Sequence, residues 1–141
     1  MRILGVDYGT RRVGLAVSDT TATLASPLGT LTRRAGRRPP LAAVAEAART
    51  QEAGRIVVGL PLPLSGEEDD WCVEVRRFGA ALQERTGLEV VYVDERFTSA
   101  RAQRGIRDAG LPLTQRRDKG RVDAAAAAVL LQAYLDGAPP R

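Results

Sequence analysis

The side chains of this sequence that could do chemistry are mainly acidic. The 141-residue chain contains no histidine and one cysteine, Cys72. This composition excludes the usual zinc ligand sets, a histidine-based triad and an internal disulfide bond. The groups that remain are carboxylates, hydroxyls, arginine, lysine and the backbone. Three well-separated carboxylates have positions that suggest a shared site: Asp7, Glu95 and Asp123.

Separated carboxylates of this kind suit hard divalent cations. Mg²⁺ and Mn²⁺ prefer oxygen ligands and keep several of their waters. Two such ions, spaced by about 4 Å, can activate a water and stabilise the leaving oxygen in phosphodiester hydrolysis. The acids therefore predict a hydrolase that acts on phosphodiester bonds with two Mg²⁺ or Mn²⁺ ions.

Each acid also has a simpler explanation. Asp7 follows an apolar run and precedes a Gly-Thr pair, so it could belong to a plain hairpin turn. Asp123, taken alone, is better explained as a helix-capping or solvent-facing residue. Asp94 is a rival to Glu95, because a one-residue change in where the strand ends exchanges the side chain that faces the site.

The elements that must position these acids follow from apolar periodicity and turn residues. An N-cap at Ser65 is expected to open the central acidic helix, and Gly87 to end it. The last helix is almost wholly apolar and should be buried. The predicted order is strands at 3–6, 13–17 and 25–31, a helix at 41–51, a strand at 55–60, a helix between Ser65 and Gly87, a strand at 89–93, and helices at 99–109 and 120–135.

This order predicts an α/β fold, with a mixed five-stranded sheet of three antiparallel and then two parallel strands flanked by helices. Sites in such sheets form outside the carboxyl ends of the parallel strands. Asp7, Leu60-Pro61 and Glu95 follow strands in this way, so we expect them at one edge. One domain at 1–136 and a loose tail at 137–141 are expected.

Positive charge is the other prominent feature. The net charge is +4 and the pI is about 10.0, mostly from arginine. Arginine binds phosphate in a bidentate manner, so nucleic acid is a reasonable partner, although a GC-rich genome also favours arginine. No apolar run is long enough to cross a membrane, and a cytoplasmic location is expected. The candidate phosphate-binding residues are Arg11, Arg12, Arg96, Arg101, Arg104, Arg107, Arg116, Arg117 and Lys119.

Four motifs together are more specific than any single residue. They are DYGTRRVGLAVSD at 7–19, VGLPL at 58–62, DERFTS at 94–99 and KGRVDAAA at 119–126. In order and spacing they resemble the bacterial YqgF/RuvX family, over essentially the whole chain. One departure is Pro63, where the family commonly has a polar residue after Gly-Leu-Pro-Leu.

The resemblance implies a ribonuclease H-like fold and a cytoplasmic nuclease. Its acids match Asp7, Glu95 and Asp123, while Gly9, Thr10, Gly59 and Pro61 are expected as structural residues near the site. Members of the family are named for processing the 5′ end of pre-16S ribosomal RNA and for a proposed role in resolving Holliday junctions, which are branched DNA. The partners to expect are therefore pre-rRNA or branched DNA, and ribosomal precursor particles.

Four functions therefore compete at this point. A resolvase should form a homodimer because it cuts two strands symmetrically, whereas a pre-rRNA nuclease could act as a monomer. A non-catalytic RNA-binding ribosome-assembly factor would keep the fold and charge without a working metal site. An ATPase of the actin and sugar-kinase superfamily is a weaker alternative, because such proteins need two lobes and this chain has room for one.

Overall fold

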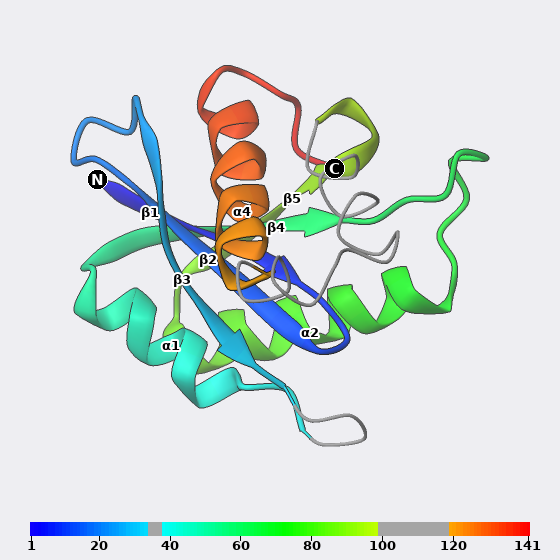
Figure 1. The fold of residues 1–141 in the computed structure, drawn as a ribbon, viewed down its shortest axis with the longest axis horizontal. Helices are drawn as coiled ribbons and strands as arrows, with labels where there is room; N and C mark the ends of the chain where they lie inside the picture. Colours follow the sequence, from blue (N-terminus) through cyan, green and yellow to red (C-terminus); the bar gives the residue numbers. More distant parts are fainter. Residues whose placement is uncertain (34–37, 99–118) are drawn as a thin grey trace.

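A computed structural model of the chain describes residues 1–33, 38–98 and 119–141, and shows a sheet with helices on both faces (Figure 1). The predicted helix at 99–109 lies outside the described residues. The described elements are β1 (Arg2–Tyr8), β2 (Arg12–Ser18), β3 (Ala25–Thr32), α1 (Leu41–Thr50), β4 (Ala53–Leu60), α2 (Asp70–Thr86), β5 (Glu89–Asp94), the 3₁₀ helix η1 (Glu95–Phe97) and α4 (Lys119–Leu135).

The five strands form one mixed sheet in the order β3-β2-β1-β4-β5. Strands β1, β2 and β3 are antiparallel neighbours, and β1, β4 and β5 run parallel to one another. The predicted sheet of three antiparallel and then two parallel strands is therefore confirmed. The carboxyl ends of β1, β4 and β5 consequently lie at one edge, which we call the acid rim.

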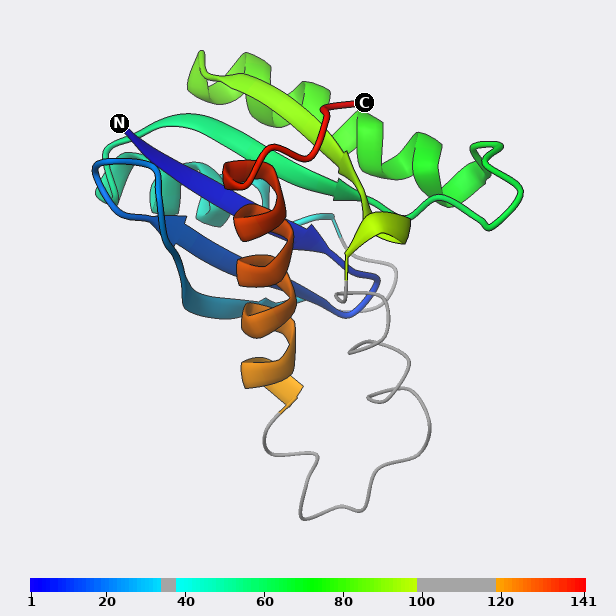
Figure 2. The ribbon, with the colours of Figure 1, turned by 90° about the horizontal axis from the view of Figure 1, so that it is seen from above.

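Successive side chains along each strand point to opposite faces of the sheet, and a hydrophobic core lies on each face. Leu4, Val6 and Tyr8 of β1 pack in the core that includes α1 and α2. Ile3 of β1 packs in the opposite core, which includes Leu131 of α4. Figure 2 shows α4 crossing its own side of the sheet, away from α2. Because both faces are covered, apolar residues occupy successive positions on β1 and β4.

Helix α2 begins later than expected. Asp69 is its N-cap, and the Asp69 carboxylate accepts a hydrogen bond from the backbone N–H of Cys72 at 2.9 Å. The predicted cap at Ser65 is wrong, because the Ser65 hydroxyl instead accepts from the N–H of Glu67 within a turn. The expected helix end is confirmed, since Gly87 is the C-cap in the left-handed conformation with φ of 73°.

The end of the chain lies against the outer edge of β5. Pro140 forms an isolated bridge with Val93, and the N–H of Arg141 donates to the carbonyl of Tyr92 at 2.8 Å. The sequence alone suggests a loose tail here, because the final residues show no periodic pattern. Pairing with the exposed edge of a strand supplies the missing constraint. Among the described residues, no helix is long and apolar enough to cross a membrane.

Glycines on the inner strands allow α4 to lie close to the sheet. A Cβ added at Gly5 of β1 would lie 2.9 Å from the Cβ of Leu131. A Cβ added at Gly14 of β2 would collide with the backbone carbonyl of Asp123. The second contact is less forgiving, because a helix backbone cannot rotate away as a side chain can. Gly14 therefore fixes how closely the amino-terminal part of α4 approaches β2.

This contact predicts that Gly14→Ala displaces α4 and lowers the free energy of unfolding by about 1–3 kcal/mol. Urea denaturation measures the change. Gly29→Ala on β3 is the matched control, because a Cβ at Gly29 meets nothing within 4 Å. It should change stability by less than about 1 kcal/mol. Equal effects of the two substitutions would contradict the proposed close contact.

Candidate active site

Asp7 occupies the centre of the acid rim. It lies near the end of β1 on the α4 face and is 3% exposed. Its register partner on β2 is Gly14. On the other side, β1 and β4 pair through Val6 and Val58, so the next residues along, Asp7 and Gly59, are neighbours. Asp7 is therefore flanked by glycines on both adjacent strands.

Glu95 approaches Asp7 over the second of these glycines. It is the first residue of η1 and is 1% exposed. A Cβ added at Gly59 would lie 2.6 Å from Oε1 of Glu95, so the carboxylate occupies the space that a side chain would fill. Adjacent strands are about 4.8 Å apart. The Glu95 carboxylate thus lies roughly one strand spacing from the backbone that carries Asp7.

Asp94, the rival of Glu95, has a different environment. Its partner on β4 is Leu60, which belongs to the core on the α1 and α2 face. The Asp94 carboxylate accepts hydrogen bonds from the Arg96 side chain at 2.8–3.2 Å and from the Arg96 backbone N–H at 2.9 Å. An Arg141 guanidinium nitrogen lies 3.7 Å away. These contacts tie β5, η1 and the chain end together.

The charge state of Asp94 agrees with a structural role. Burial raises the pKa of Asp94, but hydrogen bonds from the side chain and backbone of Arg96 outweigh it, and the net pKa is lowered. Asp94 is therefore ionised at neutral pH and bound by arginine. Arg96 is one of the predicted phosphate-binding residues. In the structure its guanidinium pairs with Asp94, and its NH1 lies 3.5 Å from the Leu64 carbonyl.

Asp123 reaches the rim from α4. It is the fifth residue of that helix and is 2% exposed, and its backbone carbonyl packs against Gly14. Its Oδ2 accepts a hydrogen bond from Nε of Arg12 at 2.5 Å. The Arg12 side chain is 23% exposed. Arg12, expected as a phosphate-binding residue, is thus the counter-ion of a buried acid in this structure.

The three acids provide oxygen donors but not an assembled metal site. Asp7, Glu95 and Asp123 are all buried around the glycines of the rim, and carboxylate oxygens suit Mg²⁺ or Mn²⁺. Within the described ranges, however, no three His, Cys, Asp or Glu side chains are grouped as ligands of one ion. The donor chemistry fits a divalent cation, while the carboxylate of Asp123 faces arginine.

A cluster not expected from the sequence holds the end of β1. Tyr8 is 2% exposed, and its ring stacks on Phe78 with centroids 4.3 Å apart. Its hydroxyl donates to Glu74 at 3.1 Å and accepts from Arg33 at 2.7 Å. These contacts anchor the residue next to Asp7 to α2 and to the end of β3. No spacing rule links residues so far apart, so sequence reasoning had no signal for it.

The other predicted site residues fall into separate groups. The turn after Asp7 closes through a hydrogen bond from the Gly9 N–H to the Arg12 carbonyl at 3.0 Å, and Thr10 and Arg11 are exposed on it. Pro61 follows β4 at the rim. Lys119 is the first residue of α4. Five predicted phosphate-binding residues lie outside the described residues: Arg101, Arg104, Arg107, Arg116 and Arg117.

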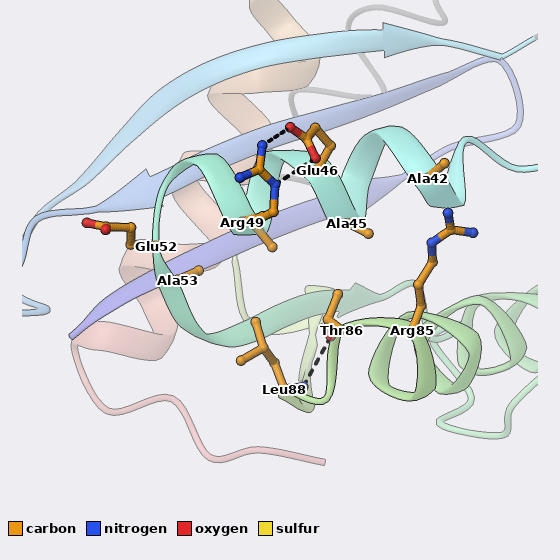
Figure 3. Close-up of a pocket in the computed structure, with 10 residues that line it drawn as sticks. Ala42, Ala45, Glu46, Arg49, Glu52, Ala53, Arg85, Thr86 and Leu88 are labelled. Carbon is orange, nitrogen blue, oxygen red and sulfur yellow. Dashed lines mark hydrogen bonds and ion pairs between the residues drawn. The ribbon is translucent and has the colours of Figure 1, made fainter.

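A pocket between α1 and the carboxyl-terminal part of α2 is separate from the acids (Figure 3). It includes Ala53, the first residue of β4, so it lies at the opposite end of that strand from the acid rim. Arg49 at its edge is paired with Glu46, with Nε to Oε2 at 2.9 Å. The pocket therefore adds no group to the candidate site.

The strand order, the antiparallel first three strands and the acids at one rim define a ribonuclease H-like fold. Solved structures with this likeness include Thermus thermophilus RuvC in complex with a Holliday junction substrate, at TM-score 0.55 and 18% identity, covering 100% of this chain and 99% of that one. The fowlpox virus Holliday junction resolvase matches at TM-score 0.55 and 14% identity, covering 96% of this chain and 98% of that chain. The predicted fold class is thereby confirmed.

The chain belongs to the RuvX family, described as Holliday junction resolvase, which matches residues 1–137. A protein of Anaeromyxobacter dehalogenans (strain 2CP-C) named "Putative pre-16S rRNA nuclease" is 44% identical over 140 residues, covering 99% of this chain and 100% of the relative. A Koribacter versatilis protein of the same name is 42% identical over 135 residues, covering 96% of this chain and 86% of the relative. The resemblance inferred from the four motifs is confirmed.

The Tyr8 cluster predicts alkaline destabilisation. Burial chiefly raises the pKa of Tyr8 from 10.0 to about 12. Because the folded protein holds this proton more tightly than the unfolded chain, stability is unaffected below pH 10 and falls as the pH rises toward 12, by up to about 2 kcal/mol. Urea denaturation across this range measures the slope.

In Tyr8→Phe, the free energy of unfolding should fall less steeply with rising pH than in the wild type. Tyr92, whose pKa is also raised by burial, should account for the fall that remains. Tyr134→Phe is the control, because it removes a phenol that accepts from Arg55 on the α4 face without touching the cluster. A Tyr8→Phe protein with the full wild-type slope would show that the Tyr8 proton is not held in this way.

The Asp94 contacts predict that Asp94→Asn lowers the free energy of unfolding at neutral pH by about 1–3 kcal/mol, because two arginines lose a charged partner. The pKa of Asp94 is lowered on folding, so its contribution is present at neutral pH and lost as the pH falls through the acid range. The difference in free energy of unfolding between the variant and the wild type should therefore shrink as the pH falls. Glu84→Gln, an exposed site on α2, controls for net charge and should change little at any pH.

Proposed function

We propose that this protein is a divalent-metal-dependent endonuclease that processes the 5′ end of pre-16S ribosomal RNA. The observation that carries the proposal is the meeting of three buried acids from β1, η1 and α4 around two glycines at one rim. Buried carboxylates are costly unless cations or hydrogen-bond donors meet them. Family membership and the names of the relatives support a nuclease that acts on this RNA.

Asp7, Glu95 and Asp123 are the residues that would hold Mg²⁺ or Mn²⁺. Bound there, the ions would supply water activation and stabilise charge on the leaving oxygen. Asp7 is fixed by its strand and by the neighbouring Tyr8 cluster. Glu95 is carried by η1, whose first turn is held by Asp94 and Arg96. In this proposal Asp94 positions the turn, and Glu95 is the metal ligand.

The chain's own groups also suit the binding of a polyanion. Thr10 and Arg11 are exposed on the turn that follows Asp7, where a phosphate near the acids would meet them. Phosphate contacts of this kind position a nucleic acid without reading its sequence. The predicted basic residues between 101 and 119 precede Asp123 along the chain, and they would extend this phosphate contact.

Resolution of Holliday junctions is the second candidate, and the description of the RuvX family favours testing it. A resolvase cuts two strands related by symmetry, so it requires a homodimer that presents two acid rims to one junction. Sedimentation with and without a four-way junction would report such a dimer. A pre-rRNA nuclease makes no such demand on oligomeric state.

The proposal predicts metal-dependent cleavage that depends on Asp7 and Glu95. We expect purified protein with Mg²⁺ or Mn²⁺ to cut a precursor 16S 5′ leader, and Asp7→Asn and Glu95→Gln to reduce the rate by roughly a hundredfold or more. Asp94→Asn should keep most of the activity at temperatures where it is folded. Glu84→Gln is the surface control with the same charge change.

A four-way DNA junction assayed in parallel separates the alternatives. Faster cleavage of the junction than of the leader would favour the resolvase over the RNA nuclease. Binding to the leader that survives Asp7→Asn, with no cleavage under either metal, would instead identify a non-catalytic assembly factor. Circular dichroism of each variant establishes that lost activity does not reflect lost structure.

A further inference from the structure

Arg12 and Asp123 form an ion pair at the place where the proposed metal site needs a carboxylate. The two residues are far apart in sequence, and their contact depends on Gly14, which lets the backbone of Asp123 lie against β2. Asp123 is almost fully buried, while Arg12 begins β2 and is partly exposed. The arginine can therefore withdraw toward solvent, but the acid has no comparable freedom.

We infer that Arg12 is a built-in competitor of the divalent cation for Asp123. The inference rests on the proposed metal-binding role of the three acids. A buried carboxylate needs a positive partner, and Arg12 supplies it when no ion does. The contact of the Arg12 guanidinium with Asp123 lowers the cost of burying that charge. Arg12 thus stabilises the protein without metal and weakens metal binding by the same interaction.

Thermodynamic linkage makes this competition measurable. If a bound cation weakens the Arg12–Asp123 pair, the pair must weaken cation binding by the same factor. A coupling of ordinary size changes affinity about five- to 150-fold. Loss of the guanidinium should consequently tighten cation binding, although the substitution destabilises the protein without metal. A purely structural ion pair would destabilise the protein and leave affinity the same or weaker.

The test is Mn²⁺ binding by isothermal titration calorimetry, with thermal unfolding with and without Mn²⁺ as a second readout. We expect Arg12→Gln to bind Mn²⁺ at least about fivefold more tightly than the wild type. Without Mn²⁺, Arg12→Gln should also melt at a lower temperature than the wild type. Addition of Mn²⁺ should raise its melting temperature by more than it raises that of the wild type. Arg12→Lys, which keeps a positive charge near Asp123, should fall between the two and serves if Arg12→Gln does not fold without metal.

Two controls separate competition from general electrostatics. Arg11→Gln removes the same charge one residue away, from an exposed position, and should change Mn²⁺ affinity by much less than Arg12→Gln does. In the Asp123→Asn background, Arg12→Gln should no longer tighten binding, because the carboxylate for which both compete is gone. Equal tightening by Arg11→Gln and Arg12→Gln would overturn the inference and leave only a long-range charge effect.

Failure of this inference is distinguishable from failure of the proposed function. Wild-type protein that binds Mn²⁺ and cleaves RNA, with an Arg12→Gln variant that binds no more tightly, would overturn the competition and leave the nuclease intact. Absence of Mn²⁺ binding in the wild type and in both Arg12 variants would overturn the metal site and the inference with it. Mn²⁺ binding detected only after Arg12→Gln would support the competition.

Discussion

The arrangement at the acid rim depends on glycines, which have no side chain, on both sides of Asp7. Gly14 on β2 and Gly59 on β4 flank the strand position of Asp7. Each glycine admits a neighbour that any other residue would exclude, the backbone of Asp123 over one and the carboxylate of Glu95 over the other. Three elements distant in sequence can therefore bring acids to one place. A sheet with ordinary side chains at these two positions would hold α4 and η1 farther away.

This constraint also explains why the acids differ in role. Residues on the α4 face lie next to the two glycines, and Asp7, Glu95 and Asp123 are each buried beside one or both of them. Asp94 pairs with Leu60, whose side chain belongs to the other core, and two arginines surround its carboxylate. Two adjacent acids thus have opposite environments because one ends the strand and the other begins a 3₁₀ turn. Asp94 holds the turn, and Glu95 reaches the rim.

The sequence predicts the sheet well because local patterns specify it. Alternating and continuous apolar runs located all five strands, and Gly87 located the end of α2. Features that depend on tertiary contacts were less accessible. Ser65 and Asp69 are both good caps, and only the packing of Cys72 and Val75 into the core selects the later start. The different surroundings of Asp94 and Glu95 follow from the register of β5 with β4, which no single strand reveals.

The Arg12 contact was inaccessible to sequence reasoning for a different reason. An arginine after an acidic turn is equally compatible with solvent, phosphate or a carboxylate, and its partner is brought near by a helix at the other end of the chain. The structure shows that one rim gathers both the acids that suit cations and an arginine that neutralises one of them. If the acids hold a cation as proposed, this arginine balances part of their charge when the ion is absent. The same balance would then weaken the attraction of the site for the ion, so stability without metal and affinity for metal would be opposing demands on Arg12.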